Sequence, residues 1–401
     1  MSPPTAKPPL SSLLSTHDFV SSSLGSLAPK PLAFLTSAAT DCHTHRSNTS
    51  TYSLLLLRPL ALIPVHQPIS LSTSILSCPV SSPLYASPTS LGKLFHPRGE
   101  LEIASACHAL RIAQVVSTSA SFPLAAVCSA QTTHPKFFSL YMDRARPNSA
   151  KLLGSLASLG VTAVWLTVDA PVMGKREADE RVPVSPSDDT TTPMAGTSAS
   201  PSRTGALGRM MGSYVDASTS WDDVAWIRRH AGAGTKIVLK GIQTASDALR
   251  AARAGVDGIV ISNHGGRSLD TSAATVLVLL ELQRCCPEVF GWMEVMIDGG
   301  IMRGTDVFKA LCLGARAVGV GRGVLHGLGY GREGVERYFS ILNEELVTTM
   351  RMCGVTSLED LHPGYVNTRA VDHLIPEGAS DQHPYAKWSR KGGGSSSKSK
   401  L

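Results

Sequence analysis

The feature that most restricts the fold of this chain is a repeated alternation of short apolar runs with helical patterns. Runs rich in β-branched and other apolar residues recur at 83–87, 114–118, 136–142, 161–169, 236–240, 258–263, 294–298 and 317–321. Their lengths are typical of buried strands. Helical patterns with recognisable ends lie between several of them. Thr244 opens one that Gly255 closes, and Thr305 opens another that Gly314 closes.

This alternation predicts an α/β fold, specifically a (β/α)8 TIM barrel, because eight parallel strand-helix units can close on themselves. A doubly wound open sheet is the alternative, and the number of runs favours the barrel. We expect residues 1–80 to form an N-terminal extension packed on the barrel, residues 81–370 the barrel, and residues 371–401 a tail. Segment 178–219 is poor in bulky apolar residues, so we expect a mobile loop over the barrel mouth after the fourth strand.

Charge and composition argue against nucleic acid as a partner. The chain has 401 residues, 43% of them hydrophobic and 17% charged, so it can bury a large core. Its net charge of +6 owes much to residues 387–401, which carry lysines and arginines but no acid. Without this tail the body is almost neutral, and a basic surface for nucleic acid is not expected.

Neither a membrane span nor a disulfide framework is expected. The longest apolar stretch, beginning at Leu54, is interrupted by Arg58 and Pro59 and is too short to cross a bilayer. The 8 cysteines form no C-x-x-C pair, which indicates a reduced intracellular protein.

The final Ser399, Lys400 and Leu401 spell the peroxisomal address S-K-L after a flexible polar leader. We therefore predict a peroxisomal import receptor as partner, with a chance tripeptide and a cytoplasmic location as the alternative.

Reactive side chains gather where the predicted strands end, and in a barrel these ends share one mouth. They are Tyr141, Thr167, Asp169, Lys175, Arg176, Lys240, Ser262, His264, Arg267, Asp298, Gly321 and Arg322. An aspartate beside a histidine raises its basicity and fixes its tautomer, and two arginines can clamp a carboxylate. Each residue alone has a structural interpretation, such as a turn cap for Asp169 or a core ion pair for Lys240. Their shared position at strand ends favours a catalytic site.

Glycine-rich turns follow the last two predicted strands. The turns at Gly299, Gly300 and Gly321, with Arg322, are typical of phosphate sites in barrels. The sequence "GYGREG" from Gly329 follows no strand, so we interpret it as a helix connection. The sequence "DCHTH" at 41–45 looks like a metal motif, but no further ligands stand at a suitable spacing, and no metal is predicted.

Three longer stretches closely resemble one enzyme family. "VLKGIQTASDALRAARAGVDGIVISNHGGRSLD", "IDGGIMRGTDVFKALCLGARAVGVGRG" and "LTVDAPVMGKREAD" resemble the FMN-dependent 2-hydroxy acid oxidases and dehydrogenases, including glycolate oxidase and the flavin domain of yeast L-lactate dehydrogenase. The resemblance extends to "SPTSLGKLFHPRGELEIASA" and "FFSLYMDR" and so covers most of the chain. It implies FMN as cofactor, oxidation of an (S)-2-hydroxy acid to a 2-oxo acid, and a homo-oligomer, commonly a tetramer.

The resemblance also implies roles for individual residues. His264 would be the base that takes a proton from the substrate, and Asp169 would orient it. Arg267 and Arg176 would hold the substrate carboxylate, and Tyr141 would bond the substrate hydroxyl. Lys240 would lie beside the flavin ring, where a cation stabilises negative charge. The other expected FMN contacts are Pro88, Thr89, Ser90, Ser117, Ser139, Thr167, Ser262, Asp298, Gly299, Gly300, Arg303, Gly321 and Arg322.

The chain departs from the family's pattern at several positions. Phe34 stands where a substrate-binding tyrosine is usual, and Ser139 replaces a glutamine at the flavin edge. Met302 occupies the place of a phosphate-binding arginine, which leaves Arg303 and Arg322 to neutralise the phosphate. These departures affect FMN affinity and substrate identity more than the chemistry.

Three functions follow as hypotheses from this resemblance. The first is an oxidase that passes electrons to oxygen and forms hydrogen peroxide, which suits a peroxisomal address. The second is a dehydrogenase that passes electrons to a cytochrome, although no haem-binding extension is recognised before the barrel. The third is a degenerate barrel that binds FMN without catalysis.

The substrate pocket is expected to be enlarged, because Ser119 stands where glycolate oxidase has a bulky side chain.

Overall fold

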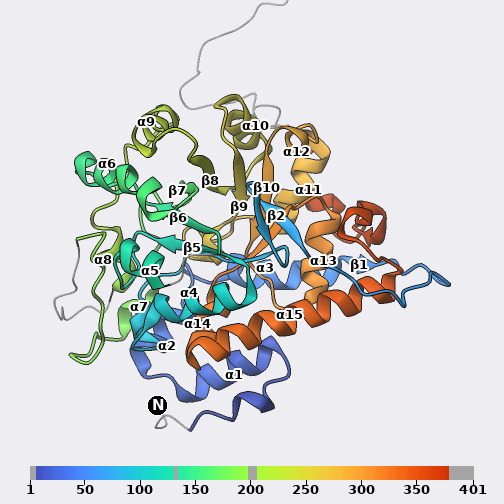
Figure 1. Ribbon diagram of the computed structural model, residues 1–401, viewed down its shortest axis with the longest axis horizontal. Coiled ribbons are helices and arrows are strands. Elements are labelled where there is room, and N and C mark those ends of the chain that lie inside the picture. Colours follow the sequence, from blue (N-terminus) through green and yellow to red (C-terminus); the bar gives the residue numbers. More distant parts are fainter. Residues whose placement is uncertain (1–5, 131–133, 197–205, 379–401) are drawn as a thin grey trace, which may run out of the picture.

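The computed structural model describes residues 6–130, 134–196 and 206–378, and at its centre is a closed barrel of parallel strands (Figure 1). Within these residues the barrel strands are β4 (Leu84–Ala86), β5 (Ala113–Ser117), β6 (Lys136–Leu140), β7 (Ala163–Thr167), β8 (Lys236–Ile242), β9 (Gly258–Ile261), β10 (Glu294–Asp298) and β11 (Ala317–Val320). Each strand pairs in parallel with the next, and β11 pairs with β4 to close the ring. The predicted (β/α)8 barrel is therefore confirmed, and the open-sheet alternative is excluded.

The interior of the barrel is filled by side chains. The ring of Phe137 stacks on Trp165 with ring centroids 5.6 Å apart, and Tyr85 meets the same indole edge-on at 5.2 Å. All three side chains are fully buried. The barrel is thus a packed core rather than a pore, and the groups able to react with a ligand must lie at its rim.

Helices surround the barrel in the order that the sequence pattern predicts. They are α4 (Gly99–Leu110), α5 (Leu124–Ala130), α6 (Arg146–Ser155), α9 (Asp222–Ala231), α10 (Ala245–Arg253), α11 (Thr275–Cys285), α12 (Val289–Trp292), α13 (Gly304–Cys312), α14 (Arg322–Leu328) and α15 (Gly331–Cys353). Thr244 caps α10 as predicted, because its side chain accepts from the Asp247 N–H. Thr305 instead lies inside α13, and the Asp306 carboxylate accepts the N–H groups of Met302 and Arg303 at that end.

The N-terminal region forms helices that the sequence did not predict. They are α1 (Thr16–Ser26), α2 (Pro29–Thr36) and α3 (His43–Leu54). Figure 1 shows α1, in blue, beside α15, in orange, and α1 contacts both α14 and α15. Helix α3 contacts α11 and the turn η4 (His264–Gly266), so the N-terminal region reaches the barrel mouth.

Two short strand pairs complete the fold. The hairpin β2 (Thr73–Ile75) and β3 (Cys78–Val80) places its buried apolar side chains against the barrel interior. Strand β1 (Leu56–Leu57) pairs with β12 (Val366–Asn367) near the C-terminal part of the chain. The hairpin closes the end of the barrel opposite the mouth, because its side chains join the cluster formed by the strand starts.

Segment 178–219 is packed where the structure describes it. It includes most of α7 (Glu177–Arg181) and all of α8 (Leu207–Gly212), while 197–205 lie outside the described residues. Asp179 and Thr192 are buried, and Lys30 of α2 donates to both the backbone and the carboxylate of Asp179. These contacts attach the segment to the N-terminal helices, and its mobility stays a prediction.

The tail 379–401, with the S-K-L tripeptide, also lies outside the described residues.

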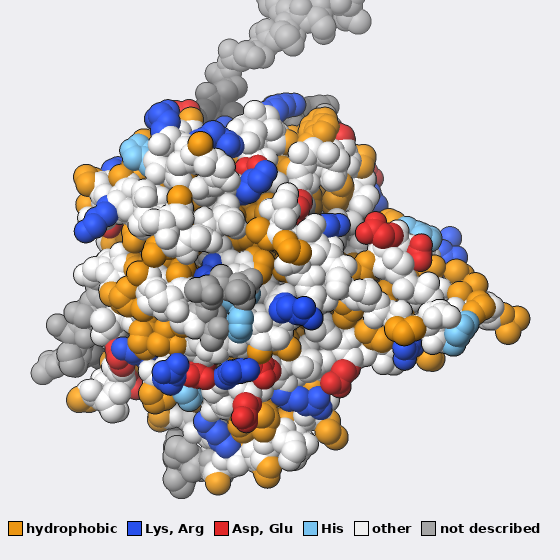
Figure 2. All heavy atoms as spheres, viewed as in Figure 1, with side chains coloured by type: hydrophobic (Ala, Val, Ile, Leu, Met, Phe, Trp, Pro, Cys, Tyr) orange, Lys and Arg blue, Asp and Glu red, His pale blue; other side chains and the backbone are white. Residues whose placement is uncertain are grey.

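The surface of the described residues carries mixed charge. Figure 2 shows basic side chains lying among acidic ones over the lower part of the face in view. Ion pairs of the described residues include Arg98–Glu102 at the start of α4 and Arg332–Glu336 in α15. Among these residues no helix combines the length and apolar character needed to cross a membrane.

Candidate active site

A cavity of about 360 Å³ lies at the C-terminal mouth of the barrel. Many of the residues singled out in the sequence line it together: Phe34, Pro88, Thr89, Ser90, Tyr141, Arg176, Lys240, His264, Arg267, Asp298, Gly299, Gly300, Gly321 and Arg322. They come from the ends of six strands, the N-terminal helix α2 and the loop after β7. The parallel direction of the strands thus brings side chains from distant parts of the sequence to one mouth.

A further group of expected contacts lies directly behind this lining. The Oγ of Ser117 is 3.4 Å from that of Ser90, and the Lys240 ammonium donates to the Ser262 hydroxyl at 3.1 Å. The hydroxyls of Ser139 and Thr167 are 3.0 Å apart. The family's usual glutamine has a longer side chain at this position. The short Ser139 side chain does not line the cavity, and its hydroxyl is hydrogen-bonded to Thr167 within the barrel wall.

His264 lies between a carboxylate and a phenol. Its Nδ1 is 2.9 Å from Oδ1 of Asp169, and its Nε2 is 3.2 Å from the Tyr141 hydroxyl. Burial lowers the pKa of His264 below its ordinary value, more than Asp169 raises it. Burial would raise the pKa of Asp169, but the charges of His264 and Lys240 outweigh this and hold it low. The imidazole is therefore neutral at neutral pH, and its Nε2 can accept a proton.

The turn that carries His264 adopts an unusual backbone conformation. His264, Gly265 and Gly266 have positive φ angles of 59°, 63° and 76°. A Cβ on Gly266 would lie 2.5 Å from the backbone nitrogen of His45, and one on Gly265 would lie 2.8 Å from the Arg322 guanidinium. The glycines are needed because the chain passes close to α3 while it turns. The strained φ of His264 is maintained by this packing.

Two buried guanidiniums stand beside the imidazole. Arg267 donates to the Phe34 carbonyl at 2.6 Å, and its guanidinium lies 4.6 Å from the centre of the Phe34 ring. Arg176 donates to the Arg267 carbonyl at 3.4 Å. Burial and repulsion by Arg176 lower the pKa of Arg267 well below its ordinary value, and its Nε has no hydrogen-bond partner among the described residues. Because arginine stays charged in proteins, this site strongly favours an anion.

Lys240 is a buried residue of the cavity lining. Its Nζ is 3.7 Å from Oδ2 of Asp298 and 4.0 Å from Oδ2 of Asp169. Burial would lower the pKa of Lys240, but Asp298 and Asp169 raise it above its ordinary value. A full positive charge is therefore fixed in a dry site, where its field acts strongly on any group that becomes negative.

The far end of the cavity is formed by the predicted glycine turns. Gly299 and Gly300 have φ angles of 99° and 79°, and a Cβ on Gly300 would lie 2.2 Å from the Asn48 carbonyl oxygen. Arg322 lines this end, as expected. Arg303 does not: its guanidinium pairs with Glu345 at 2.7 Å and does not line the cavity. The Arg303 guanidinium thus lies outside the cavity lining, and its expected phosphate role stays a prediction. Its side chain leaves the loop where α13 begins and turns toward α15.

Sequence reasoning missed the contributions of the N-terminal helices to the site. His45 of α3 lines the cavity, and Asn48 exchanges two hydrogen bonds of 2.8 Å with Asn263 in the His264 turn. His326 of α14 was also missed. The polar sequence around His45 and Asn48 has no clear period that could have indicated these contributions.

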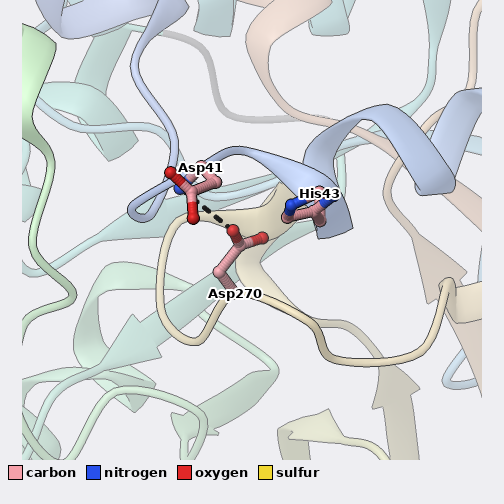
Figure 3. Close-up of side chains that lie close together, drawn as sticks. All are labelled: Asp41, His43 and Asp270. Carbon is pink, nitrogen blue, oxygen red and sulfur yellow. Dashed lines mark hydrogen bonds between the residues drawn. The ribbon is translucent and has the colours of Figure 1, made fainter.

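The "DCHTH" motif has a partner that its spacing could not show. Figure 3 shows Asp41 and His43 beside Asp270, and the possible ligand atoms of the three lie within 4.8 Å of one another. The Asp270 carboxylate already accepts the Thr44 N–H at 2.8 Å and the Asp41 N–H at 3.1 Å. Burial would raise the pKa of Asp270, but backbone hydrogen bonds from Thr44, His43 and Thr271 lower it to about 2. Asp270 therefore serves to cap the start of α3.

Comparisons with known proteins decide the family. The family model "FMN-dependent dehydrogenase" matches residues 25–368. This chain belongs to that family. L-lactate dehydrogenase (cytochrome) of Wickerhamomyces anomalus is 36% identical over 379 residues, 94% of this chain and 65% of that protein. The chain thus spans less than two thirds of the length of this relative. Peroxisomal (S)-2-hydroxyacid oxidase GLO4 of Arabidopsis thaliana is 37% identical over 340 residues, 84% of this chain and 91% of that protein.

Solved structures agree with this assignment. A flavocytochrome b2 variant with sulfite bound has a TM-score of 0.80 at 34% identity, covering 92% of this chain and 90% of the other. Mandelate oxidase with (S)-4-hydroxymandelic acid has a TM-score of 0.81 at 29% identity, covering 88% and 98%. FMN is the cofactor of the family, and FMN-dependent oxidation of 2-hydroxy acids is the chemistry that these members share.

The cavity fits FMN. Lys240 and the hydroxyls around Ser90 can face a flavin ring, and the turns at Gly299 and Gly321 can approach a phosphate closely. Two residues of the cavity lining have a buried nitrogen without a partner among the described residues, Nε in Arg267 and Nδ1 in His326. Such atoms are costly to leave unpaired, so they indicate positions where bound groups belong.

Proposed function

We propose that the protein is an FMN-dependent (S)-2-hydroxy acid oxidase, which converts its substrate and oxygen to a 2-oxo acid and hydrogen peroxide. The observation that carries the proposal is the intact group around His264. A neutral imidazole is backed by Asp169 at 2.9 Å and stands beside the buried guanidinium of Arg267. Bound FMN supplies the chemistry of accepting two electrons from the substrate.

The residues divide the remaining work among themselves. Arg267 and Arg176 bind the substrate carboxylate, which places the adjacent carbon and its hydroxyl near His264. Tyr141 contributes a hydrogen bond to the hydroxyl. His264 accepts a proton at Nε2 as the substrate is oxidised, and Asp169 stabilises the imidazolium that results. Lys240 offsets the negative charge that develops on the cofactor side of the cavity.

Oxygen is proposed as the electron acceptor because several relatives that match nearly their whole length to this chain are named as oxidases. The similarity to the cytochrome-linked lactate dehydrogenases supports a second candidate, a dehydrogenase with another acceptor. The name of the Arabidopsis relative and the S-K-L tripeptide support a peroxisomal location with its import receptor as partner. A homo-oligomer remains part of the proposal.

The test is a two-stage reaction of the purified, FMN-saturated protein. Glycolate, (S)-lactate and (S)-mandelate are added without oxygen, and bleaching of the yellow colour is followed. Air is then admitted and hydrogen peroxide is measured, with (R)-lactate as the stereochemical control. We expect bleaching by at least one (S)-acid and one peroxide per substrate. Bleaching that cytochrome c reverses much faster than air favours the dehydrogenase, and a yellow protein that no acid bleaches contradicts both.

A further inference from the structure

The far end of the cavity holds fewer fixed cations than the sequence indicated. Met302 stands on the loop after β10 without a charge, and Arg303 is paired with Glu345 outside the cavity. Arg322, which directly follows the glycine turn at Gly321, lines the cavity, whereas Arg303 does not. No acid of the described residues pairs with Arg322 within salt-bridge distance, so its charge is available to an anion.

Nδ1 of His45 binds the Arg322 guanidinium, and Nε2 of His45 takes no part in that contact. The Arg322 guanidinium donates to the Gly265 carbonyl at 2.7 Å and meets Nδ1 of His45 at 2.9 Å. Because a guanidinium can only donate, His45 accepts at Nδ1 and carries its proton on Nε2. Burial, together with the charge of Arg322, lowers the pKa of His45 to about 4. His45 is thus a neutral N–H donor on the wall of the cavity.

His326 is the second imidazole at this end. It follows Arg322 by four residues on α14, which places the two side chains on one face of the helix. His326 is only 7% exposed, and its Nδ1 has no hydrogen-bond partner among the described residues. Burial lowers the pKa of His326 to about 3. His326 lines the cavity, and its imidazole has hydrogen-bonding capacity that no described residue uses.

We propose that His326 and His45, together with Arg322, form the anchor for the FMN phosphate in this chain, in place of a second arginine at position 302. The phosphate oxygens accept from the Arg322 guanidinium and from the N–H groups of the two imidazoles. Hydrogen bonds to a charged acceptor are stronger than neutral ones, so each imidazole contributes measurably to affinity. The proposal rests on FMN binding by the family and not on the oxidase activity.

The experiment compares FMN with riboflavin, which lacks the phosphate. Flavin is removed from the full chain, and each ligand is titrated into the protein while quenching of its fluorescence is measured. We expect His326→Phe, which keeps the aromatic bulk but cannot donate, to raise the Kd of FMN by about 10- to 100-fold. The Kd of riboflavin should stay within about twofold of its value in the unaltered protein.

Two further variants keep the test decisive. Met302→Arg restores a guanidinium to the loop, so it should return the His326→Phe protein to near its original FMN affinity. Arg303→Met is the matched control on the neighbouring residue, and it should leave the Kd of FMN unchanged because Arg303 faces Glu345.

The results that overturn the proposal are distinct. FMN affinity that is unchanged in His326→Phe, or an equal loss of FMN and riboflavin binding, means that His326 does not contact the phosphate. If His326→Phe does not fold, His326→Gln, which keeps an N–H donor, must bind FMN more tightly than His326→Leu. Loss of affinity in Arg303→Met assigns the phosphate to Arg303 instead. Because no turnover is measured, failure of the oxidase proposal does not affect these outcomes.

Discussion

The two ends of the cavity differ in how strictly their chemistry fixes the side chains. At the substrate end, the proposed proton transfer needs His264, Asp169 and Tyr141 in one geometry. Nδ1 of His264 lies 2.9 Å from Asp169, and its Nε2 lies 3.2 Å from the Tyr141 hydroxyl. At the phosphate end, Met302 stands without charge and two imidazoles face the cavity. A phosphate has several acceptor oxygens and can be bound by different donors from different directions. On the proposed assignments, phosphate anchoring tolerates exchange of residues where proton transfer does not.

The largest expected effect is on the rate of flavin bleaching in a variant of His264, with little effect on FMN binding. Replacement His264→Gln removes the base while keeping a polar side chain of similar reach, so substrate-dependent bleaching should slow by about 10²- to 10⁴-fold. The Kd of FMN should change little, because His264 is at the substrate end. Stopped-flow absorbance measures the first quantity, and flavin fluorescence the second. The exposed His373 serves as control, and His373→Gln should leave both unchanged. Bleaching by His264→Gln at the original rate would remove His264 from the mechanism.

The pH dependence gives an intermediate effect. The neutral form of His264 is the base, and burial lowers its pKa below the ordinary 6.5. The value of kcat/KM for flavin reduction should therefore rise with pH, level off above a midpoint below 6.5, and fall about tenfold per unit on the acid side. Asp169→Asn should move the midpoint further down, because Asp169 raises this pKa.

Variants at the two ends sharpen the interpretation of that profile. Met302→Arg lies at the phosphate end, so it should shift the midpoint only slightly. A midpoint above 6.5 in the unaltered protein contradicts the assignment of the profile to a buried neutral His264.

The smallest expected effect concerns Phe34. Phe34→Tyr keeps the ring over Arg267 and adds a hydroxyl near the carboxylate site, so KM should fall by about 2- to 10-fold with little change in kcat. Phe34→Leu removes the cation–π contact and should raise KM by a similar factor. Steady-state kinetics with (S)-lactate or the best substrate measure both. An unchanged KM in both variants shows that residue 34 does not contribute to carboxylate binding.

Much of the candidate site could be predicted because it lies directly after strands. Asp169, Lys240, His264 and Asp298 each follow or end a run of buried apolar residues. Parallel strands in a closed barrel all end at one mouth, so the sequence order alone brings these side chains together. The roles assigned to them came from the resemblance and stay predictions.

Other parts of the site depend on contacts between distant segments. Asn48 and Asn263 are 215 positions apart, and nothing local in either segment predicts their paired hydrogen bonds. The carboxylate of Asp270 caps α3 from a similar distance. Such contacts are decided by how the N-terminal helices pack across the barrel mouth.

The sequence by itself determined the barrel, the strand-end residues and the family, because alternating strand and helix patterns and specific motifs are local properties of the chain. Only the tertiary structure decided which cations and imidazoles line the cavity beside the glycine turns. Arg303 and Met302 are neighbours in sequence, yet Arg303 pairs with Glu345 of α15 outside the cavity. His326 of α14 lines the cavity instead. The direction of a side chain at the start of a helix depends on the partners that packing supplies, and these come from the whole fold.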